Sequence, residues 1–189
     1  MKLDKHGRFI SRKLRGDRFF RLIVTLLLLS VAWWALESVG SRPGTRTGRV
    51  HTESLTEISG IVLSRNHKDV IWAHNDSGDE ARIFALGTDG KSLGVFRLEG
   101  TTAIDWEDIA IGPGPLAEKD YLYIADTGNN ALSRQTVTIY RVPEPAVDTT
   151  ITSRTQTLTG VEALSMRFPS EPRECETLLV DPRNGESYR

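Results

Sequence analysis

The sequence predicts an all-β domain of repeated four-stranded antiparallel sheets, preceded by an apolar N-terminal helix. The first observation behind this prediction is an acidic motif that opens three apolar segments, at residues 57–62, 105–110 and 174–179. The second is an aromatic-containing apolar run, ending in Asp-Ser/Thr-Gly, that follows the first two motifs at 71–78 and 122–128. A β-rich repeat with a period of about 50 residues is typical of the blades of a β-propeller.

The third copy of the repeat is incomplete. Its acidic motif begins at Glu174, and the run expected to follow would extend beyond Arg189. We therefore expect an incomplete β-propeller of about two and a third blades over residues 53–189. Open sheet edges tend to pair with other chains, so further blades or a protein partner are expected to complete the ring. In an alternative interpretation the chain is a product that ends early and is insoluble alone.

Short apolar segments separated by turns predict the individual strands. The first blade is expected to consist of strands at 58–63, 70–74, 82–86 and 92–98, with Asp89-Gly90 as a hairpin turn. The second blade is expected at 105–111, 121–125, 137–142 and within 163–168. The third blade offers a strand at 176–180 and the beginning of another at 187–189. We expect no helix after the N-terminal one.

The N-terminal region predicts export across a membrane. Residues 1–21 carry eight Lys and Arg against two acids, and residues 22–36 carry no charge. A basic segment before an apolar run is typical of a signal anchor. We expect a cytoplasmic arm at 1–21, a transmembrane anchor at 22–38 and a flexible tether at 39–52. In the alternative, a signal peptide is cleaved near Ser38–Ser41. Both interpretations locate the β domain outside the cytoplasm, periplasmic or extracellular.

Several classes of function lack the residues that they need. The apolar run directly after the basic arm predicts a membrane, not a nucleic acid, as its partner. Cys175 is the one cysteine, so no intramolecular disulfide forms. The sequence contains no glycine-rich phosphate loop, no zinc-ligand spacing and no G-x-S-x-G nucleophile elbow.

The segments together resemble a known group of proteins. The chain is similar to bacterial exported six-bladed β-propellers, and distantly to the phytase-like, gluconolactonase-like and TolB-like propellers. The resemblance covers roughly residues 55–189 and rests on segments found in the same order: EISGIVLSRNHKDVIWAHNDSG, DWEDIAIGPGP, YLYIADTGNN, VTIYRVPEP and ECETLLVDPRNGESYR. It implies that a complete member has six blades. It does not imply one activity, because propellers carry out many functions.

The acids that open the repeats are candidate metal ligands. In a propeller the first strand of each blade lines the central channel, so these carboxylates would approach one another there. Carboxylates that face one space repel unless a cation neutralises them, and Ca²⁺ accepts six to eight oxygen ligands in irregular geometry. The predicted calcium ligands are Glu57, Asp105, Glu107, Glu174 and Glu176. In the alternative interpretation these acids only cap strand ends.

Four other residues are candidate ligand-binding residues because they lie at the same ends of the predicted strands: His74, Asp76, Trp106 and Asp126. Asp76 and Asp126 are equivalent in the repeat and also fit turns in which the side chain bonds the backbone two residues on. The indole ring of Trp106 also fits packing between blades.

These observations predict a membrane-anchored binding or scaffold module of the propeller class. The alternative function is a calcium-dependent hydrolase of phosphoric esters or lactones in a complete ring. The sequence identifies neither catalytic residues nor a particular ligand.

Overall fold

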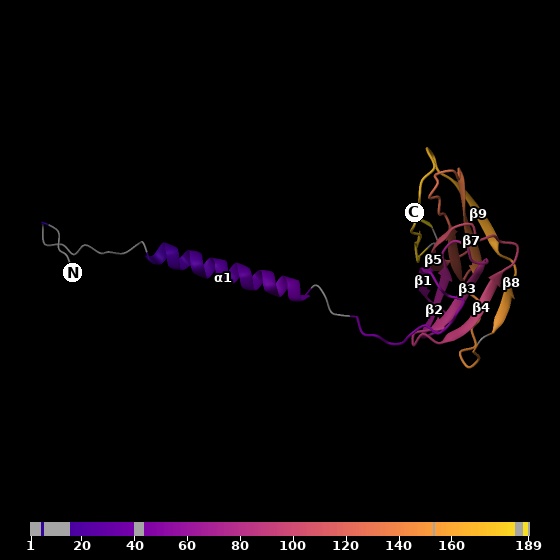
Figure 1. Cartoon of the computed structure of the whole chain (residues 1–189), viewed down its shortest axis with the longest axis horizontal. Coiled ribbons are helices and arrows are strands. Elements are labelled where there is room, and N and C mark those ends of the chain that lie inside the picture. The colour runs from indigo at the N-terminus through magenta and orange to yellow at the C-terminus, as the bar shows by residue number, and fades with distance from the viewer. Residues whose placement is uncertain (1–4, 6–15, 40–43, 153, 184–186, 189) are drawn as a thin grey trace. The chain divides into compact units, whose positions relative to one another are not determined.

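The computed structural model describes residues 5, 16–39, 44–152, 154–183 and 187–188. The chain divides into two compact units, Met1–Arg46 and Thr47–Arg189. In the first unit, helix α1 (Gly16–Val39) covers the predicted apolar segment (Figure 1). Most of the basic arm predicted at 1–21 lies outside the described residues.

The transmembrane anchor predicted at residues 22–38 is not supported by the structure. Within the described ranges, no helix is both long enough and apolar enough to cross a membrane. The structure confirms that the segment is helical.

The first sheet of the β unit contains the four strands predicted for the first blade and one strand that was not predicted. Its strand order is β1-β2-β3-β4-β8, and its first four strands pair antiparallel with their neighbours. The fifth strand pairs parallel with β4. The bounds are β1 (Ile58–Leu63), β2 (Val70–Asn75), β3 (Arg82–Gly87), β4 (Ser92–Leu98) and β8 (Thr155–Leu158).

The second sheet confirms the strands predicted for the second blade. Its order is β5-β6-β7-β9, antiparallel throughout. The bounds are β5 (Trp106–Pro113), β6 (Asp120–Asp126), β7 (Thr136–Pro143) and β9 (Glu162–Arg167). A short antiparallel pair follows, formed by β10 (Leu179–Val180) and β11 (Ser187–Tyr188). The three sheets are open, and the described residues after α1 contain no further helix.

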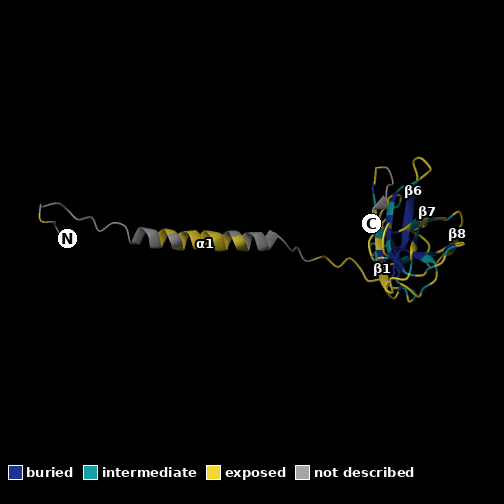
Figure 2. Ribbon diagram, turned by 90° about the horizontal axis from the view of Figure 1, so that it is seen from above, coloured by how far each residue is buried: buried dark blue, intermediate teal, exposed yellow. Residues whose placement is uncertain are grey.

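Alternating apolar residues pack the first sheet against the second. The largest core cluster joins residues of both sheets, among them Trp72 and Phe96 of the first sheet and Ile124 of the second. A second cluster buries the other face of β6 against Leu178, close to β10. Buried residues concentrate in the strands, while the loops are largely exposed (Figure 2). Burial of aromatic and β-branched side chains between sheets supplies most of the stability of such a fold.

The loop after β7 links the two sheets by hydrogen bonds. Glu144 accepts a hydrogen bond from the indole Nε1 of Trp72 at 2.8 Å and another from the hydroxyl of Ser64 at 2.5 Å. The next residue of the loop, Pro145, lies with its carbonyl oxygen 3.2 Å from His67 Nε2. The predicted turn between β1 and β2 is therefore attached to the second sheet.

The ordered β unit begins inside the segment that was predicted as a tether at 39–52. Thr47 donates a hydrogen bond from its hydroxyl to the carbonyl oxygen of Thr88, and His51 donates its N–H to the carbonyl oxygen of Gly90. Further along, Leu55 is buried against Phe84 of β3. Residues from Thr47 onward thus belong to the β unit.

We expect Gly60→Ala to destabilise the β unit by about 1–3 kcal/mol, as overpacking does in other cores. A Cβ atom at Gly60 would come within 2.2 Å of His74 Nε2 and 2.7 Å of the backbone nitrogen of Ile109 in the second sheet. Urea unfolding measures the change, with Gly44→Ala as the control because no atom lies within 4 Å of its Cβ position. Equal midpoints for the two variants would contradict the close approach of β1 and β5.

Candidate metal centre

The candidate site begins with a β-bulge in β5. The pairing of β5 with β6 shifts between Trp106 and Asp108, which leaves Glu107 without a partner in the ladder. The pairing of β1 with β2 shifts at the equivalent place and leaves out Ser59. A bulge redirects the side chain of its extra residue. The extra residue of the bulge in the first sheet, Ser59, donates its hydroxyl to the carbonyl oxygen of Glu107 at 2.9 Å.

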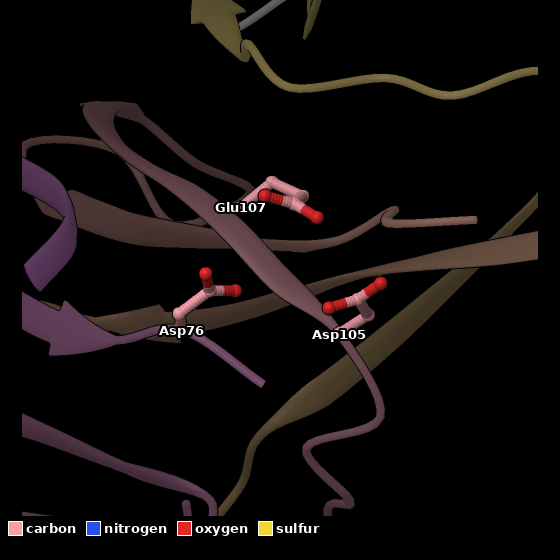
Figure 3. Close-up of side chains that lie close together, drawn as sticks. All are labelled: Asp76, Asp105 and Glu107. Carbon is pink, nitrogen blue, oxygen red and sulfur yellow. The ribbon is translucent and has the colours of Figure 1, made fainter. Parts of the chain in front are cut away.

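Two groups of carboxylates meet at Glu107. One oxygen each from Asp76, Asp105 and Glu107 lie within 4.8 Å of one another (Figure 3). A second group of the same dimension consists of Glu107, Glu174 and Glu176. The shared residue lies on β5 and Asp105 directly precedes that strand. Asp76 directly follows β2, and the other two acids lie in the segment before β10. Three parts of the chain therefore contribute to one acidic centre.

Backbone contacts hold the acids in position. The N–H of Asp76 donates to the carbonyl oxygen of Glu57 at 2.9 Å, which fixes the end of β2 beside the first acidic motif. Glu174 accepts the N–H of Asn129 on Oε1 at 2.7 Å. Gly128 leaves space for the centre, because a Cβ atom there would come within 2.2 Å of Glu107 Oε1 and 2.3 Å of the Asp105 carboxylate.

Burial and mutual repulsion change the protonation of the centre. Burial is the main cause that raises the pKa of Glu107 to about 8, and the neighbouring Glu176, Asp105 and Asp76 raise it further. Burial and the charge of Asp76 also raise the pKa of Asp105, against a hydrogen bond from Asn130. The centre therefore holds more negative charge than its surroundings stabilise.

The donor set fits a hard divalent cation. All five side chains offer carboxylate oxygens, the ligand type that Ca²⁺ prefers. The side chain of Glu107 is only 7% exposed, so water compensates its charge poorly. Glu174 Oε2 is buried and has no hydrogen-bond partner among the described residues. Buried polar atoms normally have a partner, and a cation between the acids would supply one.

Of the five predicted metal ligands, the structure brings four together: Asp105, Glu107, Glu174 and Glu176. Glu57 is exposed and belongs to neither group of acids. Asp76, predicted as a ligand-binding residue with a turn as its alternative, joins the first group. It also accepts the N–H of Ser77 on Oδ1 at 2.6 Å, so it takes part in the turn as well.

The other three predicted ligand-binding residues are enclosed by the protein. His74 is 0% exposed, with Nδ1 2.7 Å from the carbonyl oxygen of Asn75, and burial lowers its pKa. Trp106 is buried edge-on against that imidazole, with ring centroids 5.6 Å apart. Asp126 is also fully buried and accepts the N–H groups of Ile104 and Asp105. These positions favour structural roles.

The sequence repeat aligned Asp126 with Asp76, and the strand pairing shows a different equivalence. Asp126 faces Trp106 across the ladder, and Asn75 faces Ile58 in the same way. Both accept two backbone N–H groups from the segment before the first strand of their sheet. Asp126 is therefore equivalent to Asn75, which frees Asp76 for the acidic centre.

Sequence reasoning did not single out two residues that support this centre. Asn129 donates its N–H to Glu174, and its side-chain amide donates to the carbonyl oxygens of Arg134 and Arg173. Arg134 pairs with Asp126 at 2.9 Å and donates to the carbonyl oxygen of Gly128. The Asn129-Asn130 pair, directly after the second repeat, was the one sequence signal for these residues.

No protein-family model matches the chain, and no curated protein and no solved structure matches it.

In the absence of divalent cations, we expect the contribution of Glu107 to the stability of the β unit to fall as the pH rises from about 4.5 to about 8. Glu107 keeps a proton in the folded state over this range, whereas the unfolded chain releases it near the ordinary value of 4.5. Folding therefore takes up a proton, and the slope reaches at most about 1.4 kcal/mol per pH unit. Urea unfolding in EDTA at a series of pH values measures it.

Glu107→Gln provides the control, because it removes the titrating group. His74 acts in the opposite direction: its pKa is lowered in the folded state, so its contribution to stability is lost as the pH falls below 6.5. The difference between wild type and variant isolates Glu107. A difference that does not change with pH would contradict the raised pKa.

Proposed function

We propose that residues 53–189 form part of a β-propeller that binds Ca²⁺ and serves as a binding module. The succession of two antiparallel four-strand meanders along the chain, β1 to β4 and β5, β6, β7 and β9, and the close approach of β1 to β5 support this architecture. The exposed apolar side chains of β1 (Ile58, Ile61 and Leu63) support completion of the ring by further blades or by a protein partner.

The observation that carries the calcium site is the position of Glu107. It is nine-tenths buried, lies on a bulge and belongs to both groups of carboxylates. A bulge that directs a carboxylate toward four others destabilises the protein unless a cation or a proton offsets the charge. A cation explains the arrangement with the ligands that the chain provides.

Binding explains the geometry better than hydrolysis does. A calcium-dependent hydrolase also needs a group that accepts a proton at the substrate. The histidine among the candidate ligand-binding residues, His74, is fully buried with its imidazole against Trp106. Binding of a ligand to the cation requires only the centre and an adjacent surface.

Calorimetric titration of the full chain with CaCl₂ tests the proposal. We expect saturable binding with a dissociation constant below about 1 mM, within the range of protein calcium sites. Mg²⁺ is expected to bind more weakly, because it requires a near-octahedral shell and retains its waters. No heat with Ca²⁺, together with an unchanged melting temperature, would overturn the calcium site.

The location outside the cytoplasm is part of the proposal and rests on the sequence. Its support is the basic stretch at 1–21 directly before the uncharged run at 22–36. Protease added to intact spheroplasts is expected to digest the region after Ser41. Protection of that region, with digestion only after lysis, would overturn this location.

A further inference from the structure

The outer edge of the second sheet is formed by a long and regular strand. β9 follows β7 in the strand order, and within the described residues no strand pairs with its other side (Figure 1). It is six residues long, contains no proline and pairs with β7 without a shift in register. Such an edge presents a row of backbone N–H and C=O groups that can pair with another strand.

The other edges of the two large sheets are protected. β1 and β5 each carry a bulge, and a Cβ atom at Gly60 of β1 would lie 2.7 Å from the backbone nitrogen of Ile109 in β5. β8 has four residues and is itself the added strand that covers the edge of β4. Bulges, short strands and covering segments are the devices by which proteins blunt a sheet edge. Of the four described edges, β9 is therefore the one that favours pairing.

The charges of β9 favour an antiparallel partner of the same sequence. Glu162 begins the strand and Arg167 ends it, and both are exposed. Glu162 keeps 47% of its side-chain surface exposed although it pairs with Arg141 of β7. A second copy in antiparallel orientation places the acidic end of each strand beside the basic end of the other, whereas a parallel copy brings like charges together. Antiparallel pairing also creates a two-fold axis, the commonest symmetry of oligomers, and uses the free edge of both copies.

The pleat of the strand determines which residues would meet. Residues directly opposite each other in an antiparallel pair point to the same face of the sheet, and side chains alternate between the faces along a strand. A two-fold axis must therefore pass through a residue of β9, and axes at Leu164 or Ser165 pair most of the strand. With the axis at Ser165, Leu164 lies opposite Met166 of the second copy. With the axis at Leu164, Met166 would instead lie opposite the carboxylate of Glu162.

The axis at Ser165 also extends an apolar surface. Leu164 and Met166 are partly buried and pack against the second core cluster, which includes Ile139 of β7. Their contact across the axis would join this cluster to its copy, while Ser165 lies on the opposite, exposed face. Pairing would then bury apolar area in addition to forming backbone hydrogen bonds.

We propose that β9 pairs with β9 of a second copy of this chain, antiparallel about a two-fold axis at Ser165. The second sheets of the two copies then form one continuous sheet. The proposal does not depend on the calcium site. It uses the outer edge of the second sheet and leaves the exposed side chains of β1 available to the blades or the partner that complete the ring.

Disulfide trapping in the full chain tests the pairing. In a Cys175→Ser background, Ser165→Cys places two thiols opposite each other at the axis, where the Cα separation of about 4.5–5.5 Å in an antiparallel pair permits a disulfide. Thr157→Cys is the matched control, because Thr157 is also exposed and also lies on an edge strand, β8. We expect mild oxidation to convert most of the Ser165→Cys chain to a covalent dimer on a non-reducing gel, and little of the control. Equal cross-linking of both variants, or of neither, would overturn the proposal.

Sedimentation of the full chain measures the strength of the dimer. A non-ionic detergent is included to cover the exposed apolar residues of α1. Ser165→Lys brings two like charges together at the axis, so we expect the dissociation constant of the dimer to rise about fivefold or more. Thr157→Lys is expected to leave it unchanged. A chain that stays monomeric at every concentration, or a dimer that Ser165→Lys does not weaken, would overturn the proposal and leave the calcium site intact.

Discussion

Replacement of Glu107 by glutamine is expected to weaken calcium binding by about 100-fold or more. Loss of a residue that merely supports a metal ligand typically weakens affinity 10–100-fold, and Glu107 is shared by both groups of carboxylates. Glutamine removes the negative charge from the middle of the centre and retains one weaker oxygen ligand. Calorimetric titration with CaCl₂ measures the change.

The same substitution is expected to leave the fold intact. The raised pKa of Glu107 means that the folded protein favours the neutral side chain near pH 7 when no cation is bound. Glutamine resembles that neutral form in size and can donate its amide N–H to a neighbouring carboxylate. The variant is therefore expected to be at least as stable as wild type in EDTA, and to gain little stability from Ca²⁺.

Glu99→Gln is the matched control. Glu99 is exposed and follows β4, outside both groups of acids, so its neutralisation changes the net charge equally without touching the centre. Wild-type affinity in this control would assign the loss to the site. Equal affinity in wild type and Glu107→Gln would instead mean that Ca²⁺ binds elsewhere.

The strands of the first two sheets could be predicted because their signals are local. In β1 to β4, apolar runs alternate with polar turns, and Asp89-Gly90 marks the hairpin before β4. The strand β8 could not be predicted in this way. It is short, is Thr-rich and pairs in parallel with a strand about 60 residues earlier, without a hairpin signal.

The site was predicted only in part for a similar reason. The acidic motifs indicated Asp105, Glu107, Glu174 and Glu176, because repeated acids at strand starts converge when sheets stack. The inclusion of Asp76 depends on backbone register. The bulges at Ser59 and Glu107 determine which residue of β2 and β6 ends the ladder, and sequence spacing cannot resolve a shift of one residue.

The largest expected change in stability concerns Asp126, the residue of β6 that pairs with Trp106 beyond the bulge in β5. We expect Asp126→Ala to destabilise the β unit by about 3–5 kcal/mol, as removal of one partner from a buried ion pair does elsewhere. The variant would leave the guanidinium of Arg134 without its carboxylate, at a position where its side chain is 17% exposed. The N–H groups of Ile104 and Asp105 would also lose their acceptor. Urea unfolding of the full chain measures the change.

Asp126→Asn separates the contribution of the ion pair with Arg134 from that of the two backbone hydrogen bonds. The first sheet shows why. At the equivalent position Asn75 accepts the N–H groups of Thr56 and Glu57 on its amide oxygen, so an asparagine can perform this role in the fold. The variant would lose the ion pair with Arg134, which still donates to two backbone carbonyl oxygens. Its single amide oxygen would have to accept both N–H groups that now bond separate carboxylate oxygens, as the amide oxygen of Asn75 does. We therefore expect a smaller loss of about 1.5–3 kcal/mol, typical of a hydrogen bond to a charged group. If Asp126→Asn were as unstable as Asp126→Ala, the ion pair alone would hold this end of β6. An asparagine could then not replace Asp126 in the way that Asn75 serves the first sheet.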